Sequence, residues 1–106
     1  MTKVKIISGA CGFVTDIEAS GGDDEEITLK AVSGCSHVGK LFETLGESFD
    51  GYELCLHKPG SGPLYAYAAE FFPTHCGCPV IAGVVKAVEA ECKLALPKDA
   101  SIQFIE

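Results

Sequence analysis

Alternating apolar and polar positions predict three strands in the first third of the chain. The stretches are residues 3–8, 13–19 and 26–33, and they are rich in β-branched side chains. Alternation with a period of two is typical of strands that bury one face. A cluster of turn-forming residues at 20–24 separates the second stretch from the third. This spacing predicts an antiparallel hairpin.

Helical spacing of apolar positions follows the predicted hairpin. A first amphipathic helix opens at 34–36 and ends at Gly46, with Val38, Leu41, Phe42 and Leu45 on its apolar face. Residues 64–72 are apolar nearly all round and lie between two prolines, which predicts a short buried helix. Its aromatic residues Tyr65, Tyr67, Phe71 and Phe72 are expected in the core or along a pocket.

The longest helical pattern starts at Pro79, which suits the first helical position and makes Cys78 the N-cap residue. Its apolar stripe consists of Val80, Ile81, Val84, Val85, Val88 and Cys92. Two weaker strand patterns remain, at 52–57 and at 101–105, and a glycine- and proline-rich loop follows the first of them.

These elements predict one α+β domain over residues 1–106. The expected order is β-β-β-α-α-α-β, with a small, mostly antiparallel sheet and helices packed on one of its faces. A chain of 106 residues is long enough for one modest core.

Charge and hydropathy exclude several classes of partner. The net charge is −7, and all eight basic residues are scattered lysines, so we expect no nucleic-acid partner. No apolar run approaches the roughly 18 residues of a membrane span, and the start of the chain does not resemble a signal peptide. We therefore expect a cytoplasmic protein that does not bind membranes.

Four of the six cysteines stand where predicted elements meet. Cys11 lies between the first two strands, Cys35 before the first helix, and Cys76 and Cys78 before the last helix. The hairpin is expected to bring Cys11 and Cys35 to the same end of the sheet. A helix N-terminus stabilises a thiolate, and clustered cysteines in a reducing compartment favour metal binding or thiol chemistry over disulfides. Zinc and an iron–sulfur cluster both suit such ligands.

The arrangement resembles the IscU/NifU-type iron–sulfur scaffold family. The matching pieces are Ala10-Cys11-Gly12, Gly34-Cys35-Ser36 and His75-Cys76-Gly77-Cys78, separated by 24 residues from Cys11 to Cys35 and by 43 from Cys35 to Cys78. The resemblance covers roughly residues 8–93. It departs from the family at Phe13, which replaces an aspartate linked to cluster lability, and in lacking room for a helix before the first strand.

That resemblance implies an IscU/NifU-like fold and a set of metal ligands. Cys11, Cys35 and Cys78 would supply three thiolates, and Cys76 or His75 would be the fourth ligand. The bound species would be an iron–sulfur cluster or Zn²⁺, and the partners would be sulfur-donor or cluster-acceptor proteins. Cys76 matches the local motif and Cys78 the overall spacing, so either could be the third ligand.

Two alternatives stand beside this metal-binding hypothesis, under which the protein is not an enzyme. In the first, the chain is a sulfur-transfer or redox protein, with Cys76 or Cys78 as a nucleophile activated by His75 and the helix N-terminus. In the second, it is an interaction module whose cysteines merely pack. A packing role is also the expectation for Cys92 and Cys55. The sequence leaves the oligomeric state open.

Overall fold

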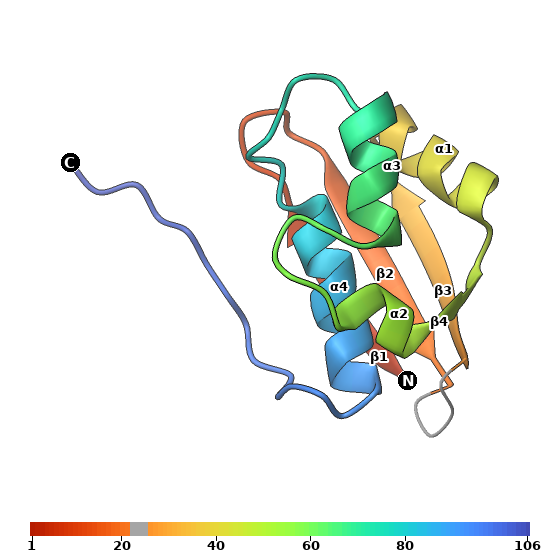
Figure 1. Ribbon diagram of the computed structural model, residues 1–106. Helices are drawn as coiled ribbons and strands as arrows, with labels where there is room; N and C mark the ends of the chain where they lie inside the picture. Colours follow the sequence, from red (N-terminus) through yellow and green to blue (C-terminus); the bar gives the residue numbers. More distant parts are fainter. Residues whose placement is uncertain (22–25) are drawn as a thin grey trace.

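The three predicted strands form a meander that a short fourth strand extends (Figure 1). The computed structural model describes residues 1–21 and 26–106. Its sheet has the order β1-β2-β3-β4, with β1 (Thr2–Ile7), β2 (Val14–Ser20), β3 (Glu26–Ser33) and β4 (Ser48–Asp50). All neighbouring strands pair antiparallel. The β2–β3 pairing confirms the hairpin, although most of its turn, predicted at 20–24, lies outside the described residues.

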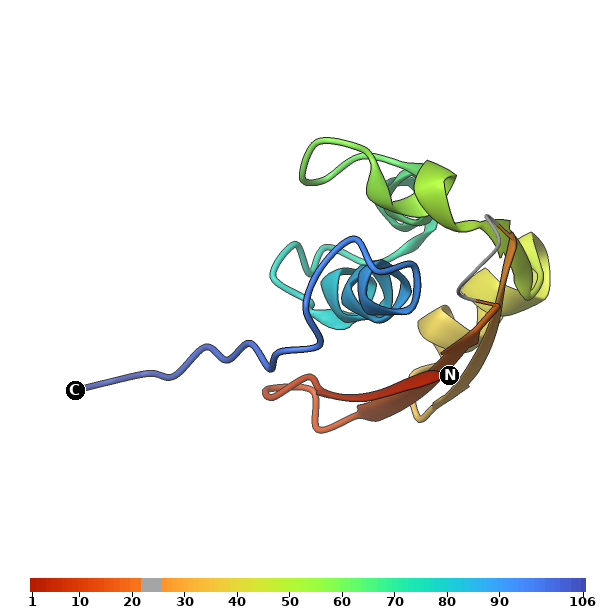
Figure 2. The ribbon, with the colours of Figure 1, turned by 90° about the horizontal axis from the view of Figure 1, so that it is seen from below.

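Within the described residues, helices cover one face of this sheet, as Figure 2 shows from below. They are α1 (Ser36–Leu45), α2 (Gly51–Cys55), α3 (Pro63–Phe71) and α4 (Val80–Glu91). The predicted α+β class, with a small antiparallel sheet and helices on one face, is therefore confirmed. None of the helices in the described part of the chain is long and apolar enough to span a membrane.

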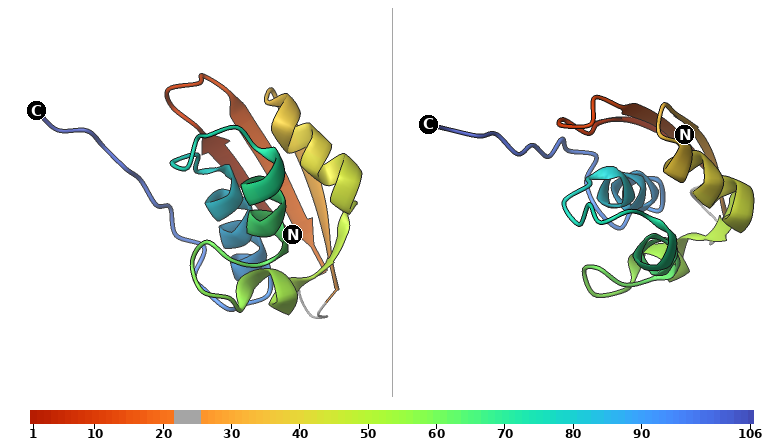
Figure 3. Two further views of the ribbon diagram at one scale, coloured as in Figure 1. Left: turned by 45° about the horizontal axis from the view of Figure 1, so that its top comes forward. Right: turned by 90° about the horizontal axis from the view of Figure 1, so that it is seen from above.

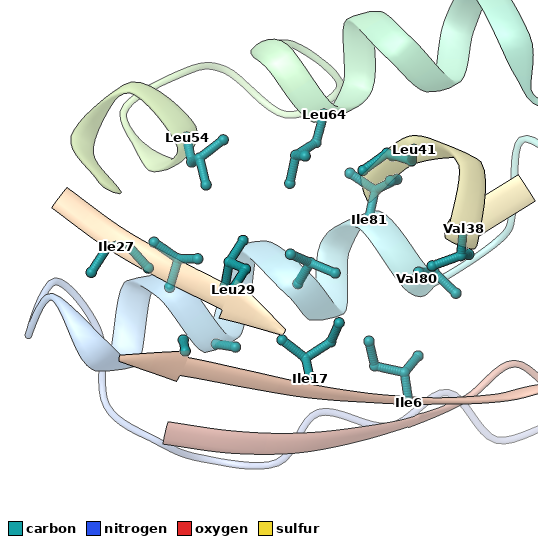
Figure 4. Packing of buried hydrophobic residues seen from close by; sticks show 14 of the residues in the cluster. Ile6, Ile17, Ile27, Leu29, Val38, Leu41, Leu54, Leu64, Val80 and Ile81 are labelled. Atoms are coloured by element: carbon teal, nitrogen blue, oxygen red, sulfur yellow. The ribbon is translucent and has the colours of Figure 1, made fainter. Parts of the chain in front are cut away.

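The core lies between the sheet and α4 (Figure 4). Strand alternation places Ile17, Ile27 and Leu29 on the covered face, where each is 0% exposed. Helix α4 adds Val84 and Val88, which are also buried, so the apolar stripe predicted for this helix is confirmed. The opposite face of the sheet carries charged side chains such as Lys3 and Glu18, which form a 3.6 Å ion pair.

Two predicted elements are wrong in type. Residues 52–57 do not form a strand, because Asp50 caps α2 by accepting hydrogen bonds from the N–H groups of Tyr52 and Glu53. This cap outweighs the brief alternation that follows it. Residues 101–105 do not form a strand either; they are exposed and extend away from the domain (Figures 1 and 2). A strand needs a neighbour for its backbone hydrogen bonds, and the described fold places none beside this segment.

Two helix details also differ from expectation. Helix α3 is not buried all round, since only Leu64 is buried and Phe71 is 56% exposed. The N-cap of α4 is Pro79, so Pro79 is not the first helical residue and Cys78 is not the N-cap. The carbonyl of Pro79 accepts the first helical hydrogen bond, from the N–H of Gly83 at 2.9 Å, which makes Pro79 the cap residue. The helix consequently begins one residue later than predicted.

Candidate functional site

Cys11 lies in the tight turn that joins β1 to β2. The N–H of Gly12 donates to the carbonyl of Gly9 at 2.9 Å, which places Cys11 in the middle of a four-residue turn. Gly9 and Gly12 both have positive φ, at 86° and 76°, which explains why glycines flank the cysteine. The Cys11 side chain is exposed at the tip of this turn.

Cys35 occupies the N-cap position of α1, which agrees with its predicted place before the first helix. Its N–H donates to Oγ of Ser33 at 3.1 Å, and Ser33 Oγ shares a 2.7 Å hydrogen bond with the hydroxyl of the buried Thr15. This chain of hydrogen bonds ties the cysteine to the ends of β2 and β3. The Cys35 side chain is half-buried and packs against the core.

Phe13 connects the Cys11 turn to the segment before α1. A Cβ atom on Gly34 would lie 2.9 Å from Cδ1 of Phe13, so the ring covers the glycine. The N–H of Gly34 also donates to the carbonyl of Val14 at 3.4 Å. These contacts confirm that Cys11 and Cys35 lie at the same end of the sheet, and they give Phe13 a structural role at this end.

The loop of residues 73–79 carries His75, Cys76 and Cys78. Two short backbone hydrogen bonds lie within it, from the N–H of His75 to the carbonyl of Pro73 at 2.7 Å and from Cys78 to His75 at 3.1 Å. His75 and Cys76 are exposed, whereas Cys78 is half-buried and packs against the core. The loop therefore presents one imidazole and one thiol to solvent and holds a second thiol against the protein.

The three segments that carry the candidate ligands lie at one end of the fold. We call this end the cysteine end; it consists of residues 8–13, Cys35 and residues 73–79. Figure 3 (left) shows this end at the top, with the β1–β2 turn, the start of α1 and the loop before α4. Within residues 1–21 and 26–106, however, no three His, Cys, Asp or Glu side chains converge to hold a metal ion. The candidate ligands share an end of the molecule but do not form an assembled metal centre.

Aromatic side chains border the cysteine end on the α3 side. The rings of Tyr67 and Phe71 have centroids 4.7 Å apart, and Phe72 stands edge-on to Tyr67 at 6.2 Å. The imidazole of His37, in the first turn of α1, lies 6.0 Å from the Phe72 ring. His37 is thus half-buried beside an aromatic ring. Of the four aromatic residues expected in the core or along a pocket, Tyr65, Tyr67 and Phe72 pack against the core, whereas Phe71 is exposed.

The two remaining cysteines have a different environment. Burial raises the pKa of the Cys55 thiol to about 12, and Glu89 and Cys92 act in the same direction. The Cys55 Sγ atom lies 3.9 Å from the carbonyl oxygen of Val85, to which it donates. Burial also raises the pKa of Cys92, with Glu91 and Asp50 adding to the effect. Both thiols stay protonated at neutral pH and have the packing role expected for them.

Two contributors to the cysteine end were not identified from the sequence. Ser33 holds the backbone of Cys35 and is itself held by Thr15, and their only sequence signal is that Ser33 ends β3 and Thr15 stands near the start of β2. The groove of about 430 Å³ between α1 and β3 was also missed. It is lined by Ala31, Ser33, Val38, Gly39, Phe42, Glu43 and Glu47.

Comparison with known proteins gives a family but no activity. Searches of the curated proteins and of the solved structures found no match. A family model described as "Family of unknown function (DUF6951)" matches residues 2–104. That description does not link the chain to the IscU/NifU scaffolds, so this resemblance remains a prediction. Because the match spans nearly the whole sequence, the chain belongs to the DUF6951 family.

Proposed function

We propose that this chain is a cytoplasmic metal-binding protein that carries Zn²⁺ or an iron–sulfur cluster on the thiolates of its cysteine end. Cys11, Cys35 and Cys78 would be ligands, with Cys76 or His75 completing the set. The observation that carries the proposal is that four of the six free cysteines and the His75 imidazole share one end of the sheet, whereas the half-buried Cys55 and the buried Cys92 lie elsewhere.

The chemistry of these donors fits the proposed metals. Thiolate sulfur is the ligand that zinc and iron–sulfur clusters share, and an imidazole can complete a zinc site. Cys11 and Cys76 are exposed, which argues against a packing role for these two. Cys35 at the N-cap of α1 lies where the helix dipole favours an anion.

Metal binding in this proposal requires the ligands to approach one another. Cys35 is held by its hydrogen bond to Ser33 and is the fixed member of the set. Cys11 and Cys76 lie in exposed segments, a glycine-flanked turn and a loop with short internal hydrogen bonds. Closure of these two segments over Cys35 would couple metal uptake to ordering of the cysteine end. The bound metal would be either the cargo that the protein carries or a structural cross-link between its ligands. Sulfur-donor or cluster-acceptor proteins would be the partners of this protein.

Anaerobic purification followed by iron, sulfide and zinc analysis tests the proposal. We expect about one metal centre per chain in the wild-type protein and its loss in Cys35→Ala and Cys78→Ala. Cys92→Ala is the matched control, because it removes a cysteine of the interior and should leave the metal content unchanged. Absence of metal in the wild type, or an unchanged content in Cys35→Ala, contradicts the proposal.

A second candidate function rests on the exposure of Cys76 next to His75. The Cys76 thiolate would attack the outer sulfur of a donor persulfide. The new sulfur–sulfur bond would form on Cys76, the donor's bond would break, and the donor cysteine would leave as a thiolate. Alkylation of metal-free protein distinguishes this function, since one thiol that reacts rapidly near neutral pH supports it. Uniformly slow alkylation of Cys76 and Cys78 contradicts it.

A further inference from the structure

The C-terminal arm, residues 96–106, lies outside the packed domain. Every residue of the arm is exposed, and Figures 1 and 2 show it running away from α4. Its large apolar side chains are among the most exposed of the described residues: Ile102 is 88%, Phe104 100% and Ile105 92% exposed. Apolar surface of this kind on a short segment indicates a missing contact.

The arm has the residue pattern of a strand, but the described fold provides no neighbouring strand to pair with it. Ile102 and Phe104 alternate with polar neighbours, and β-branched and aromatic residues favour extended pairing. The last backbone hydrogen bond along the described arm joins the N–H of Lys98 to the carbonyl of Leu96 at 2.8 Å. Residues 99–106 therefore offer a row of unpaired backbone groups to a neighbouring strand.

The sheet has an open edge of matching length at β1. This six-residue strand pairs with β2 on one side only, so the described fold leaves its other side without a strand. An unpaired edge is a template for the addition of another strand. At the end of β1, the side chain of Ile7 is 71% exposed on the outer face of the sheet, which adds apolar surface to this edge.

We propose that the arm of one copy adds as a strand to the β1 edge of a second copy, and that the exchange is reciprocal across a twofold axis. Eleven arm residues reach about 36 Å when extended, which exceeds the length of β1. Each copy would contribute its eleven-residue arm and the six residues of its β1 edge. Together these approach the roughly 20 residues that each partner contributes to a stable interface. The pairing is self-complementary, as a closed dimer requires.

The direction of the arm favours a second copy over the arm's own domain. Thr2 at the start of β1 donates to Oε1 of Glu91 at the end of α4, at 2.7 Å, so the arm leaves the domain near the start of β1. The arm and its own β1 consequently run in the same sense, and direct pairing between them would be parallel. A second copy related by a twofold axis can present β1 in the antiparallel sense, which is the more stable pairing and that of the whole described sheet.

The side chains of the arm suit this edge. Alternation places Ile102 and Phe104 on one face of the added strand and Ile105 on the other. On the covered face, α4 passes over β1 with Gly83, where a Cβ atom would lie 2.5 Å from Ile6. Ala90 follows Gly83 by seven residues on the same helix face and is half-buried, so small side chains border the space above the edge. Ile105 would then lie on the outer face, as Ile7 does.

Light scattering coupled to size-exclusion chromatography, over a wide range of concentration, tests the exchange on the full chain. We expect a mass twice the 11.1 kDa of one chain. The double variant Ile102→Asp/Phe104→Asp should raise the dimer dissociation constant by about a hundredfold or more, because the two apolar anchors on one face of the added strand are lost. Ser101→Asp is the matched control: it adds charge to the same segment without removing an apolar side chain, and it should remain dimeric.

Hydrogen exchange measured by mass spectrometry supplies a second readout. In the wild-type dimer the β1 amides should be protected, and a chain ending at Leu96, which retains every element of the packed domain, should lose that protection and become monomeric. A wild-type protein that is monomeric at all concentrations overturns the proposal. If truncation still removes the protection of the β1 amides in such a monomer, the arm pairs with β1 of its own copy. A dimer that survives the truncation overturns it as well.

Discussion

The ring of Phe13 lies against Gly34, and this contact joins the turn that carries Cys11 to the residue before Cys35. A Cβ atom on Gly34 would be 2.9 Å from Cδ1 of Phe13, closer than side chains normally approach. Phe13 is 42% exposed. The Cys11 turn and the segment before α1 are thus joined by an aromatic ring at the position where the scaffold family that the sequence resembles has an aspartate.

Substitution of Gly34 by alanine should displace Phe13 and destabilise the fold by about 1 kcal/mol or more. Chemical denaturation measures the change. Gly39→Ala is the control, since a Cβ at Gly39 in α1 meets nothing within 4 Å and should stabilise the helix by about 0.5–1 kcal/mol. In a Phe13→Ala background, the cost of Gly34→Ala should shrink; an equal cost in both backgrounds would show that the ring is not responsible.

Gly83 is required by the close approach of α4 to β1. A Cβ at this position would lie 2.5 Å from two atoms of the buried Ile6 side chain. We expect Gly83→Ala to lower the free energy of unfolding by about 1–3 kcal/mol, although alanine is the better helix former. In a double-mutant cycle, the loss of unfolding free energy caused by Gly83→Ala should be smaller in an Ile6→Val background than in the wild type, because the smaller side chain frees space. Additive effects in this cycle would contradict the proposed clash.

The hydrogen-bonded hydroxyl pair of Thr15 and Ser33, which supports Cys35, should contribute to the stability of the fold. Ser33→Ala removes the partner of the fully buried Thr15 hydroxyl and the acceptor for the Cys35 N–H, and should cost about 1–3 kcal/mol. Adding Thr15→Val removes the orphaned hydroxyl and should recover part of this loss in thermal unfolding. No recovery in the double variant would mean that the buried hydroxyl is not the source of the cost.

The interior thiol of Cys55 predicts how stability changes at alkaline pH. Burial raises its pKa from the ordinary value of 9.0 to about 12, so the unfolded chain loses this proton at lower pH than the folded protein. The stabilising contribution is therefore complete below pH 9 and is lost as the pH rises towards 12. Denaturation curves over this range should fall more steeply for the wild type than for Cys55→Ser. A Cys55→Ser curve that falls as steeply as that of the wild type would contradict this prediction.

Several parts of the fold followed directly from local sequence. The bounds of β3 agree with the predicted residues 26–33, and Gly46 ends α1 with a φ of 85°, its N–H donating to the carbonyl of Phe42 at 2.9 Å. Cys35 lies directly before α1, as predicted, and is its N-cap. These features depend on alternation, helical periodicity and glycine geometry, which neighbouring residues determine among themselves.

Other features depended on contacts between distant segments. Strand β4 has only three residues and exists because it pairs with β3, so no local pattern could identify it. Residues 101–105 have the pattern of a strand, yet the described fold provides no partner for them. For the cysteine end, the sequence predicted that Cys11 and Cys35 share one end of the sheet, but not the contact between Phe13 and Gly34.

The sequence by itself thus determined the three long strands, the helices α1, α3 and α4, and the location of the cysteines at the junctions between these elements. Only the tertiary structure decided that, within the described residues, those thiols do not converge on a metal site, and that the C-terminal arm leaves the domain. The physical reason is that periodicity encodes which face of an element is buried. Distances between loops and the presence of a partner strand depend on how the elements pack against one another.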